Sequence, residues 1–165
     1  MSRAIGCTRR VWLGALALLA PKWAQAQAGT LTLTLLEGPA ALVVGAKAFD
    51  AQEGLRLAAG ALIETGTNTG LLRLESADGS LLDLGPGTRA MLQPPRRGAS
   101  VPGLYLLSGW AKLQGGPNQP HGGLLCPLLD LEPAQAGVVL EVGAAQVALF
   151  SERGTSKLLE RGGAK

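Results

Sequence analysis

The residue types that most often carry catalysis are sparse in this sequence. His121 is the only histidine of the 165-residue chain, and Cys7 and Cys126 are its only cysteines. A serine hydrolase needs a histidine as proton carrier, and a zinc site needs three or four histidine, cysteine or carboxylate ligands. His121 lies in a Pro/Gly-rich stretch, so we expect a solvated loop residue. The sequence predicts no catalytic residue, no metal site and no cofactor.

Four carboxylates come close together in the middle of the chain: Glu64, Glu75, Asp78 and Asp83. A pair of carboxylates can hydrolyse a glycosidic bond. Sugar-binding sites usually also offer aromatic side chains, and residues 29–165 contain few: Phe49, Tyr105, Trp110 and Phe150. Because Asp78 is followed by Gly79, we interpret Asp78 as the first residue of a tight turn.

Residues 85–90 read Gly-Pro-Gly-Thr-Arg-Ala, which matches the spacing of a dinucleotide-binding loop. That loop works because its glycine turn opens a helix whose N-terminus faces the pyrophosphate. Pro94 and Pro95 would end such a helix within two turns, and no acidic residue follows at about 20 positions. We therefore interpret the segment as a β-turn.

Residues 1–28 have the three-part layout of a cleavable export signal, which we expect to form a signal-peptide helix. A basic start with Arg3, Arg9 and Arg10 precedes an apolar run over residues 11–20. Small residues then form the cleavage region: Ala24, Ala26 and Ala28. We expect cleavage after Ala26 or Ala28. A membrane span needs about 20 apolar residues, so we expect no stable anchor and a periplasmic or secreted protein.

The route of export is open between two alternatives. Arg9 and Arg10, followed by Val11, resemble a twin-arginine signal, which a receptor reads. Lys22 also fits, because a late positive charge disfavours the general secretory route. Paired arginines occur in general signals as well, so both routes stand. Cys7 precedes the apolar run and is not placed as a lipoprotein acylation site.

The basic surplus of the chain belongs to the predicted signal. The whole sequence has 15 Lys+Arg and 12 Asp+Glu, and residues 1–28 hold four of the basic residues and no acidic one. The remainder has 11 against 12, a formal charge of −1. This balance gives no support for nucleic-acid binding, which needs a dense basic face. After cleavage Cys126 is the only cysteine, and it is either buried or a route to an intermolecular disulfide.

Alternating apolar and polar residues predict short strands along residues 29–161. The expected strands and strand pairs are Thr30–Leu35, Gly70–Leu84 with a turn at Asp78 and Gly79, Thr88–Gln93, Leu104–Leu107 paired with Trp110–Gln114 around Ser108 and Gly109, and Val138–Val142 paired with Gln146–Phe150. A helix is expected only around Phe49–Ala58. Residues 94–98 read as a loop, residues 115–123 as a flexible loop, and the tail from Gly162 is expected to fray.

These elements predict an all-β fold in one domain over residues 29–161, built as a β-solenoid or a sandwich. Glycine reverses the chain without a Cβ clash. We therefore assign structural roles at turns to Gly60, Gly66, Asp78, Gly79, Gly85 and Gly87.

Several short pieces of the sequence form an ordered series. They are Leu36-Glu37-Gly38-Pro39-Ala40, Gly60-Ala61-Leu62-Ile63-Glu64-Thr65-Gly66, Leu72-Arg73-Leu74, Asp78-Gly79-Ser80, Leu84-Gly85-Pro86-Gly87-Thr88 and Leu107-Ser108-Gly109-Trp110-Ala111. In order and spacing they resemble a FecR-type periplasmic domain over roughly residues 35–115, and more faintly over residues 126–152.

The resemblance implies an all-β periplasmic module that, in its family, relays a signal from an outer-membrane transporter to a cytoplasmic sigma factor. We expect this chain to lack the anti-sigma region and the retained membrane span of that relay. The sequence thus predicts a non-enzymatic scaffold that binds another envelope protein, with exposed strand edges as docking sites. The alternative is a small-ligand or glycan-binding module with a cleft lined by Tyr105, Trp110 and nearby carboxylates.

Overall fold

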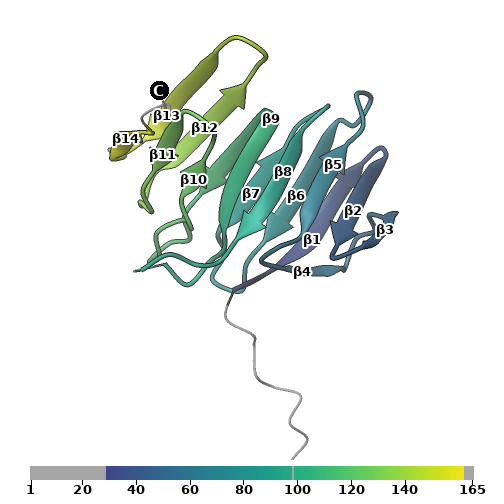
Figure 1. The fold of residues 1–165 in the computed structure, drawn as a ribbon. Coiled ribbons are helices and arrows are strands. Elements are labelled where there is room, and N and C mark those ends of the chain that lie inside the picture. Colours follow the sequence, from purple (N-terminus) through teal and green to yellow (C-terminus); the bar gives the residue numbers. More distant parts are fainter. Residues whose placement is uncertain (1–28, 98, 162–165) are drawn as a thin grey trace, which may run out of the picture.

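The computed structural model describes residues 29–97 and 99–161, which form one all-β domain (Figure 1). The predicted signal peptide, its cleavage region, the twin-arginine motif and the tail from Gly162 lie outside the described residues. No helix in the described part of the chain is long and apolar enough to span a membrane.

Fourteen strands make up the described domain. They are β1 (Thr30–Glu37), β2 (Ala40–Val44), β3 (Lys47–Asp50), β4 (Arg56–Ala58), β5 (Leu62–Thr65), β6 (Leu71–Glu75), β7 (Leu81–Leu84), β8 (Arg89–Gln93), β9 (Gly103–Gln114), β10 (Leu124–Leu125), β11 (Leu129–Leu131), β12 (Gly137–Val142), β13 (Val147–Arg153) and β14 (Leu158–Glu160).

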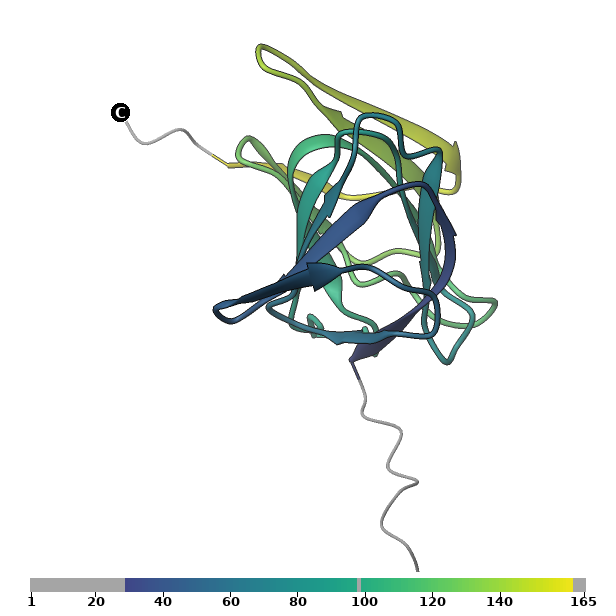
Figure 2. The ribbon, with the colours of Figure 1, turned by 90° about the vertical axis from the view of Figure 1, so that its right-hand side faces the viewer.

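The strands form one continuous sheet that curls so that two parts of it enclose the core. We name these two parts the first sheet and the second sheet. The first sheet runs β4-β1-β6-β7-β9-β12-β13, and the second runs β3-β2-β5-β8-β9-β10-β11-β14. All pairs are antiparallel except β9 with β10. Figure 2 looks from the end that holds β3 and β4 and shows the sheet curling round as a half-barrel.

Alternation along the strands fills the space between the two sheets with leucine. On β1, Leu31 and Leu33 are buried, whereas Thr32 and Thr34 point away from the core. The same period of two holds on the partner strands, because directly opposite residues share a face. The largest fully buried side chains are almost all leucine: Leu33, Leu42, Ile63, Leu72, Leu74, Leu84, Leu92, Leu104, Leu106, Leu124, Leu131 and Leu140.

The chain crosses between the two sheets four times at one corner, and neighbouring crossings are hydrogen-bonded to each other. We call residues 38–39, 66–70, 85–88 and 108–110 the corner stack. Buried threonines link its layers: the hydroxyl of Thr69 donates to Pro39 O at 2.5 Å, and that of Thr65 donates to Gly85 O at 2.6 Å. Thr88 donates to Trp110 O and accepts from Trp110 N, each at 3.1 Å.

Several predicted strands are confirmed. The alternation of residues 30–35 lies in β1, the segment around Asp78 and Gly79 forms the β6–β7 hairpin, and β12 and β13 pair as expected. Residues 94–97 and 115–123 contain no strand.

The predicted helix around Phe49–Ala58 is wrong. Phe49 pairs with Leu42 as part of β3, and Leu57 pairs with Leu31 as part of β4. Gly54, with φ of +87°, lies in the turn between these strands. The helical propensity of the segment was already weak because of Gly54, and pairing with β1 and β2 decides its structure.

The predicted strand pair around Ser108 and Gly109 is also wrong. These residues lie inside the single long strand β9, whose first half pairs with β8 and whose second half pairs with β7 and β12. Gly109 has φ of +83° at the point where β9 passes from the second sheet to the first. The glycine therefore bends one strand instead of closing a hairpin.

Candidate functional site

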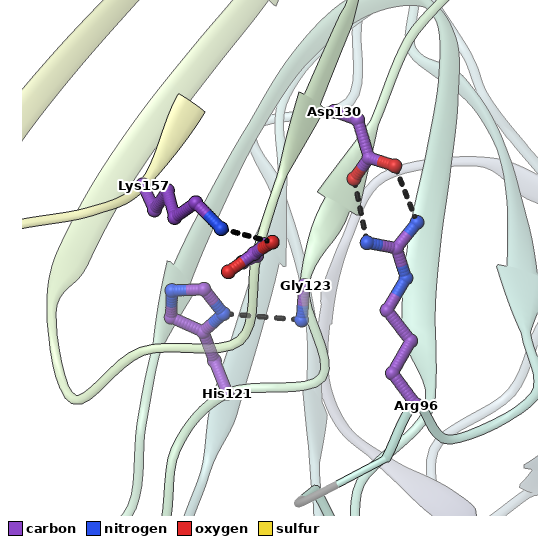
Figure 3. Close-up of polar contacts among 6 residues, drawn as sticks. Arg96, His121, Gly123, Asp130 and Lys157 are labelled. Atoms are coloured by element: carbon purple, nitrogen blue, oxygen red, sulfur yellow. Dashed lines mark hydrogen bonds and ion pairs between the residues drawn. The ribbon is translucent and has the colours of Figure 1, made fainter. Parts of the chain in front are cut away.

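His121 is buried, so the prediction of a solvated residue is wrong. Its side chain accepts a hydrogen bond at Nδ1 from Gly123 N at 3.1 Å, and Nε2 has no partner within the described ranges (Figure 3). Burial lowers the pKa of His121 to about 4. The imidazole is therefore neutral at pH 7 and packs among apolar residues beside Pro102 and Leu104.

Ion pairs around His121 fasten the loops to β11 (Figure 3). Arg96 makes two hydrogen bonds to the carboxylate of Asp130, at 2.5 and 2.9 Å. Lys157, just before β14, pairs with Glu132 at 3.0 Å. These groups are neutralised by each other, which indicates a structural role.

Cys126 is fully buried, which favours the first of the two alternatives left by the sequence. Its sulfur accepts a hydrogen bond from Leu129 N at 3.3 Å in the turn between β10 and β11. A thiol in this position behaves as a small apolar side chain.

Of the four carboxylates singled out in the sequence, Glu75 and Asp78 line one groove, whereas Glu64 and Asp83 are each paired with an arginine elsewhere. Glu64 pairs with Arg89 on the second sheet at 2.7 Å. Asp83 makes a two-pronged bond to Arg73 on the first sheet, at 2.7 and 2.9 Å. That hydrogen bond and the charge of Asp83 raise the pKa of Arg73.

Asp78 occupies the β6–β7 turn as expected, and its carboxylate is held ionised. Partial burial alone would raise its pKa, but hydrogen bonds donated by Ser76, the amide of Ser80 and the hydroxyl of Ser100 outweigh burial and lower the pKa. A carboxylate with a lowered pKa is a poor general acid near neutral pH.

Tyr105 and Trp110 do not share a cleft. Tyr105 lies in the half of β9 that pairs with β8, and Trp110 lies in the half that pairs with β12, so they belong to different sheets. The Trp110 ring covers Gly85, where a Cβ would overlap the indole. The cleft proposed from the sequence is therefore not formed by these residues.

The turn glycines have two kinds of environment. Gly60, Gly79 and Gly87 have positive φ, of +90°, +79° and +61°, whereas no positive φ is found at Gly66 and Gly85. Gly85 is required by contact with Trp110 instead. The segment 85–90 forms a turn that leads into β8 rather than a helix.

An open groove lies between the free edges of β3 and β4, and we name this region the β3/β4 end. Each of these strands pairs on one side only, β3 with β2 and β4 with β1. The groove has a volume of about 390 Å³ and is mostly apolar in its lining: Val44, Lys47, Phe49, Leu55, Arg56, Leu57, Ala58, Ala59 and Ala61. Val44 and Phe49 are 46% and 41% exposed.

Two cations stand at this apolar groove without an ion pair. Lys47 and Arg56 line it, and neither has a carboxylate partner in the part of the chain that the structure describes. The sequence reasoning missed both, because it assigned part of this segment to a helix. The groove forms where the β2–β3 hairpin lies next to β4, which is held by pairing with the distant strand β1.

The opposite extremity of the domain is formed by β13 and β14, and we name it the β13/β14 end (Figure 1). β13 pairs only with β12, and β14 only with β11. Large apolar side chains are exposed here: Leu149, Phe150, Leu158 and Leu159. Outside this apolar set, Lys112 on β9 donates to Glu152 on β13 at 2.8 Å and lowers the pKa of Glu152.

A second, larger groove follows the outer side of β1 and is lined mainly by residues with polar side chains, so we name it the polar groove. It has a volume of about 670 Å³. Its lining carries hydroxyl and charged groups: Thr30, Thr32, Thr34, Arg56, Glu75, Ser76, Asp78 and Ser100. Thr32 lies between Arg56 on β4 and Glu75 on β6 in the strand register. Among the described residues no three histidine, cysteine or carboxylate side chains are grouped to hold a metal.

Comparisons with protein-family models, with curated proteins and with solved structures each returned no match. The resemblance to FecR-type domains therefore rests on the sequence pieces alone and stays a prediction. Those pieces supply much of the corner stack, which contains Gly38 and Pro39, Gly66, Gly85 to Thr88, and Ser108 to Trp110.

Proposed function

We propose that this protein is an exported, non-enzymatic module of the cell envelope, FecR-like in its β domain, that binds protein through the β3/β4 end. The observation that carries the proposal is the groove of about 390 Å³ between two free strand edges, apolar inside and edged by Lys47 and Arg56. We further propose that the corner stack makes the fold solenoid-like at that corner.

Free strand edges suit protein recognition for a physical reason. An extended segment can complete the hydrogen-bond ladder of an edge strand while its alternate side chains enter a pocket. At the β3/β4 end the pocket beside the edges already contains Phe49 and Val44, both substantially exposed. The two unpaired cations favour a partner with a carboxylate near its apolar contact.

The absence of an enzyme function is supported by how the reactive groups are engaged. Asp83 and Glu64 are paired with arginines on different sheets, and His121 is buried and neutral. Export to the periplasm or beyond is supported by the layout of residues 1–28 in the sequence.

Site-specific photo-crosslinking in cells that carry the gene naturally tests this function. A photoreactive residue in place of Phe49 is expected to capture a protein, because that side chain lies in the groove. The matched control is the same residue in place of Leu107, which is 38% exposed in the middle of β9. Equal capture from both positions, or none from position 49, would contradict the proposal.

A second candidate function is supported by the polar groove beside β1. Its row of threonine hydroxyls, with Arg56, Glu75 and Asp78, offers the donors and acceptors that a glycan needs. Cell-wall fragments and free sugars should then raise the melting temperature in a saturable manner, and Thr32→Val should reduce the rise. No stabilisation at millimolar ligand would exclude this candidate.

A further inference from the structure

Both sheets run from the β3/β4 end of the domain to the β13/β14 end. In the second sheet β3 is the free strand at one end and β14 at the other. In the first sheet the corresponding free strands are β4 and β13. If the β13/β14 end of one molecule met the β3/β4 end of another, both sheets could continue across the junction.

The core-facing side of these free strands is apolar at both ends. On β3, Phe49 lies opposite the fully buried Leu42 and so faces the core side. On β14, Leu158 lies opposite the buried Leu131 and faces the same way. Phe49 and Leu158 are 41% and 45% exposed because no further strand covers them.

Each free strand of the second sheet also carries one charge on its core-facing side. Lys47 lies opposite Val44 on β2, and Glu160 lies opposite Leu129 on β11, which packs against the core. Neither Lys47 nor Glu160 has an ion-pair partner within residues 29–97 and 99–161. The core-facing sides of β3 and β14 thus have the same apolar character and opposite charge.

A charge on the inner side of an edge strand opposes pairing with a like edge. A contact between two β3 edges would place two Lys47 side chains on the same side of the junction, and a contact between two β14 edges would do the same with two Glu160 side chains. A contact between a β3 edge and a β14 edge instead places the oppositely charged Lys47 and Glu160 on the same side of the junction. Because an exposed ion pair contributes little affinity, apolar contact supplies the binding and the charges select the orientation.

We propose that a second copy of this chain is the partner of the β3/β4 end, docking there with its β13/β14 end. This inference rests on the proposed function and names the occupant of that docking site. The contact is heterologous, since each copy uses two different surfaces, so it propagates to chains of copies instead of stopping at a symmetric dimer.

Charge reversal and mixing test the inference on the purified chain, expressed from its full-length gene. The mass of the wild type in sedimentation velocity should rise with concentration beyond two copies. Lys47→Glu or Glu160→Lys alone should weaken self-association about tenfold or more. Arg97→Glu, a reversal at an exposed loop residue outside both ends, should leave it unchanged.

The decisive sample is an equimolar mixture of the two single variants. The Glu160→Lys variant presents Lys at its β14 edge and keeps Lys47, whereas the Lys47→Glu variant presents Glu at its β3 edge and keeps Glu160. Both junctions between unlike variants therefore pair opposite charges, whereas every junction between like variants pairs equal charges. The mixture should therefore form alternating chains that grow beyond two copies, although each variant alone associates weakly. The doubly reversed chain should also form longer species without a partner variant.

A wild type that stays monomeric at every accessible concentration would overturn the inference, as would a mixture no larger than its components. These failures are distinguishable from failure of the proposed function. Photo-capture of a different protein from position 49 would keep the docking role of the β3/β4 end and overturn self-association. Photo-capture of a second copy would support both.

Discussion

The corner stack and the two open ends differ in how completely their groups are engaged. In the corner stack, backbone and threonine hydroxyl groups bond across neighbouring crossings, and there is no room for a Cβ at Gly85 or Gly109. At the ends, strand edges are free and Phe49, Phe150 and Leu158 are exposed. The glycine-containing segments that resemble FecR-type domains form much of the corner stack, where the hydrogen-bonding groups are engaged. The exposed groups that a partner could contact lie at the two ends.

The recognisable sequence pattern therefore lies in the fold-forming corner and not at the proposed binding surface. Trp110 illustrates the point, because it is one of the two aromatic residues, with Tyr105, that the sequence places in a ligand cleft, and it covers Gly85 instead. Lys47 and Glu160, which belong to no motif, carry the unpaired charges at the ends.

The largest expected effect comes from filling the corner stack. Gly109→Ala should destabilise the domain by about 3 kcal/mol or more, since it combines a strained positive φ with overlap of Thr88. Urea denaturation measures the change. Gly143→Ala is the control, because its Cβ would make only ordinary contacts and φ is not positive. Equal losses of stability at Gly109 and Gly143 would contradict the claim that the corner stack is the more tightly packed region.

The buried histidine should make stability depend on pH. Its pKa is about 4 in the folded protein and 6.5 in the unfolded reference, so the unfolded chain binds more protons between these values. Stability should therefore fall as pH falls from 6.5 to 4, by roughly 3 kcal/mol from this group.

Urea denaturation at pH 7, 5 and 4 measures that dependence. His121→Asn, which keeps an acceptor near Gly123 N, should lose this part of the slope. The same slope in wild type and variant would show that His121 is solvated after all, as the sequence alone suggested.

A smaller effect is expected from removing one hydroxyl of the corner stack. Thr88→Val deletes both hydrogen bonds to the backbone of Trp110 and should cost about 1–2 kcal/mol. Thr34→Val, at an exposed position of β1, should change stability by less than about 0.5 kcal/mol. A larger loss at Thr34 would mean that the polar groove contributes more to stability than the corner.

The smallest effect on stability is expected at the ends. Lys47→Glu should leave the free energy of unfolding within about 0.5 kcal/mol of the wild type, because the side chain is exposed and unpaired. Denaturation at a concentration low enough to keep the chain monomeric checks this value. A strong destabilisation would show that Lys47 serves the fold rather than docking.

The sequence predicted the elements whose pattern is local. Strict alternation placed β1, and the Asp78-Gly79 turn placed the β6–β7 hairpin. It failed where distant partners decide the structure: β4 exists because β1 pairs with it, and Ser108-Gly109 continues β9 where Thr88 packs. It also missed β3, which forms a local hairpin with β2.

The sequence predicted what kind of site to expect but not where in the fold it lies. Exposed strand edges were expected, but their positions depend on which strands end each sheet, and that follows from the whole topology. The opposite charges of Lys47 and Glu160 bear on docking only because the pairings with Val44 and Leu129 place both side chains on the core-facing side. Their sequence separation leaves no local signal.

Amide hydrogen exchange at increasing protein concentration tests the central claim most directly. If the ends carry the docking function, protection should rise with concentration at the free strands β3, β4, β13 and β14. The amides of the corner stack should be protected equally at every concentration, since their bonds lie within one copy. Unchanged exchange at the four free strands, or new protection confined to the outer faces of the sheets, would contradict the account.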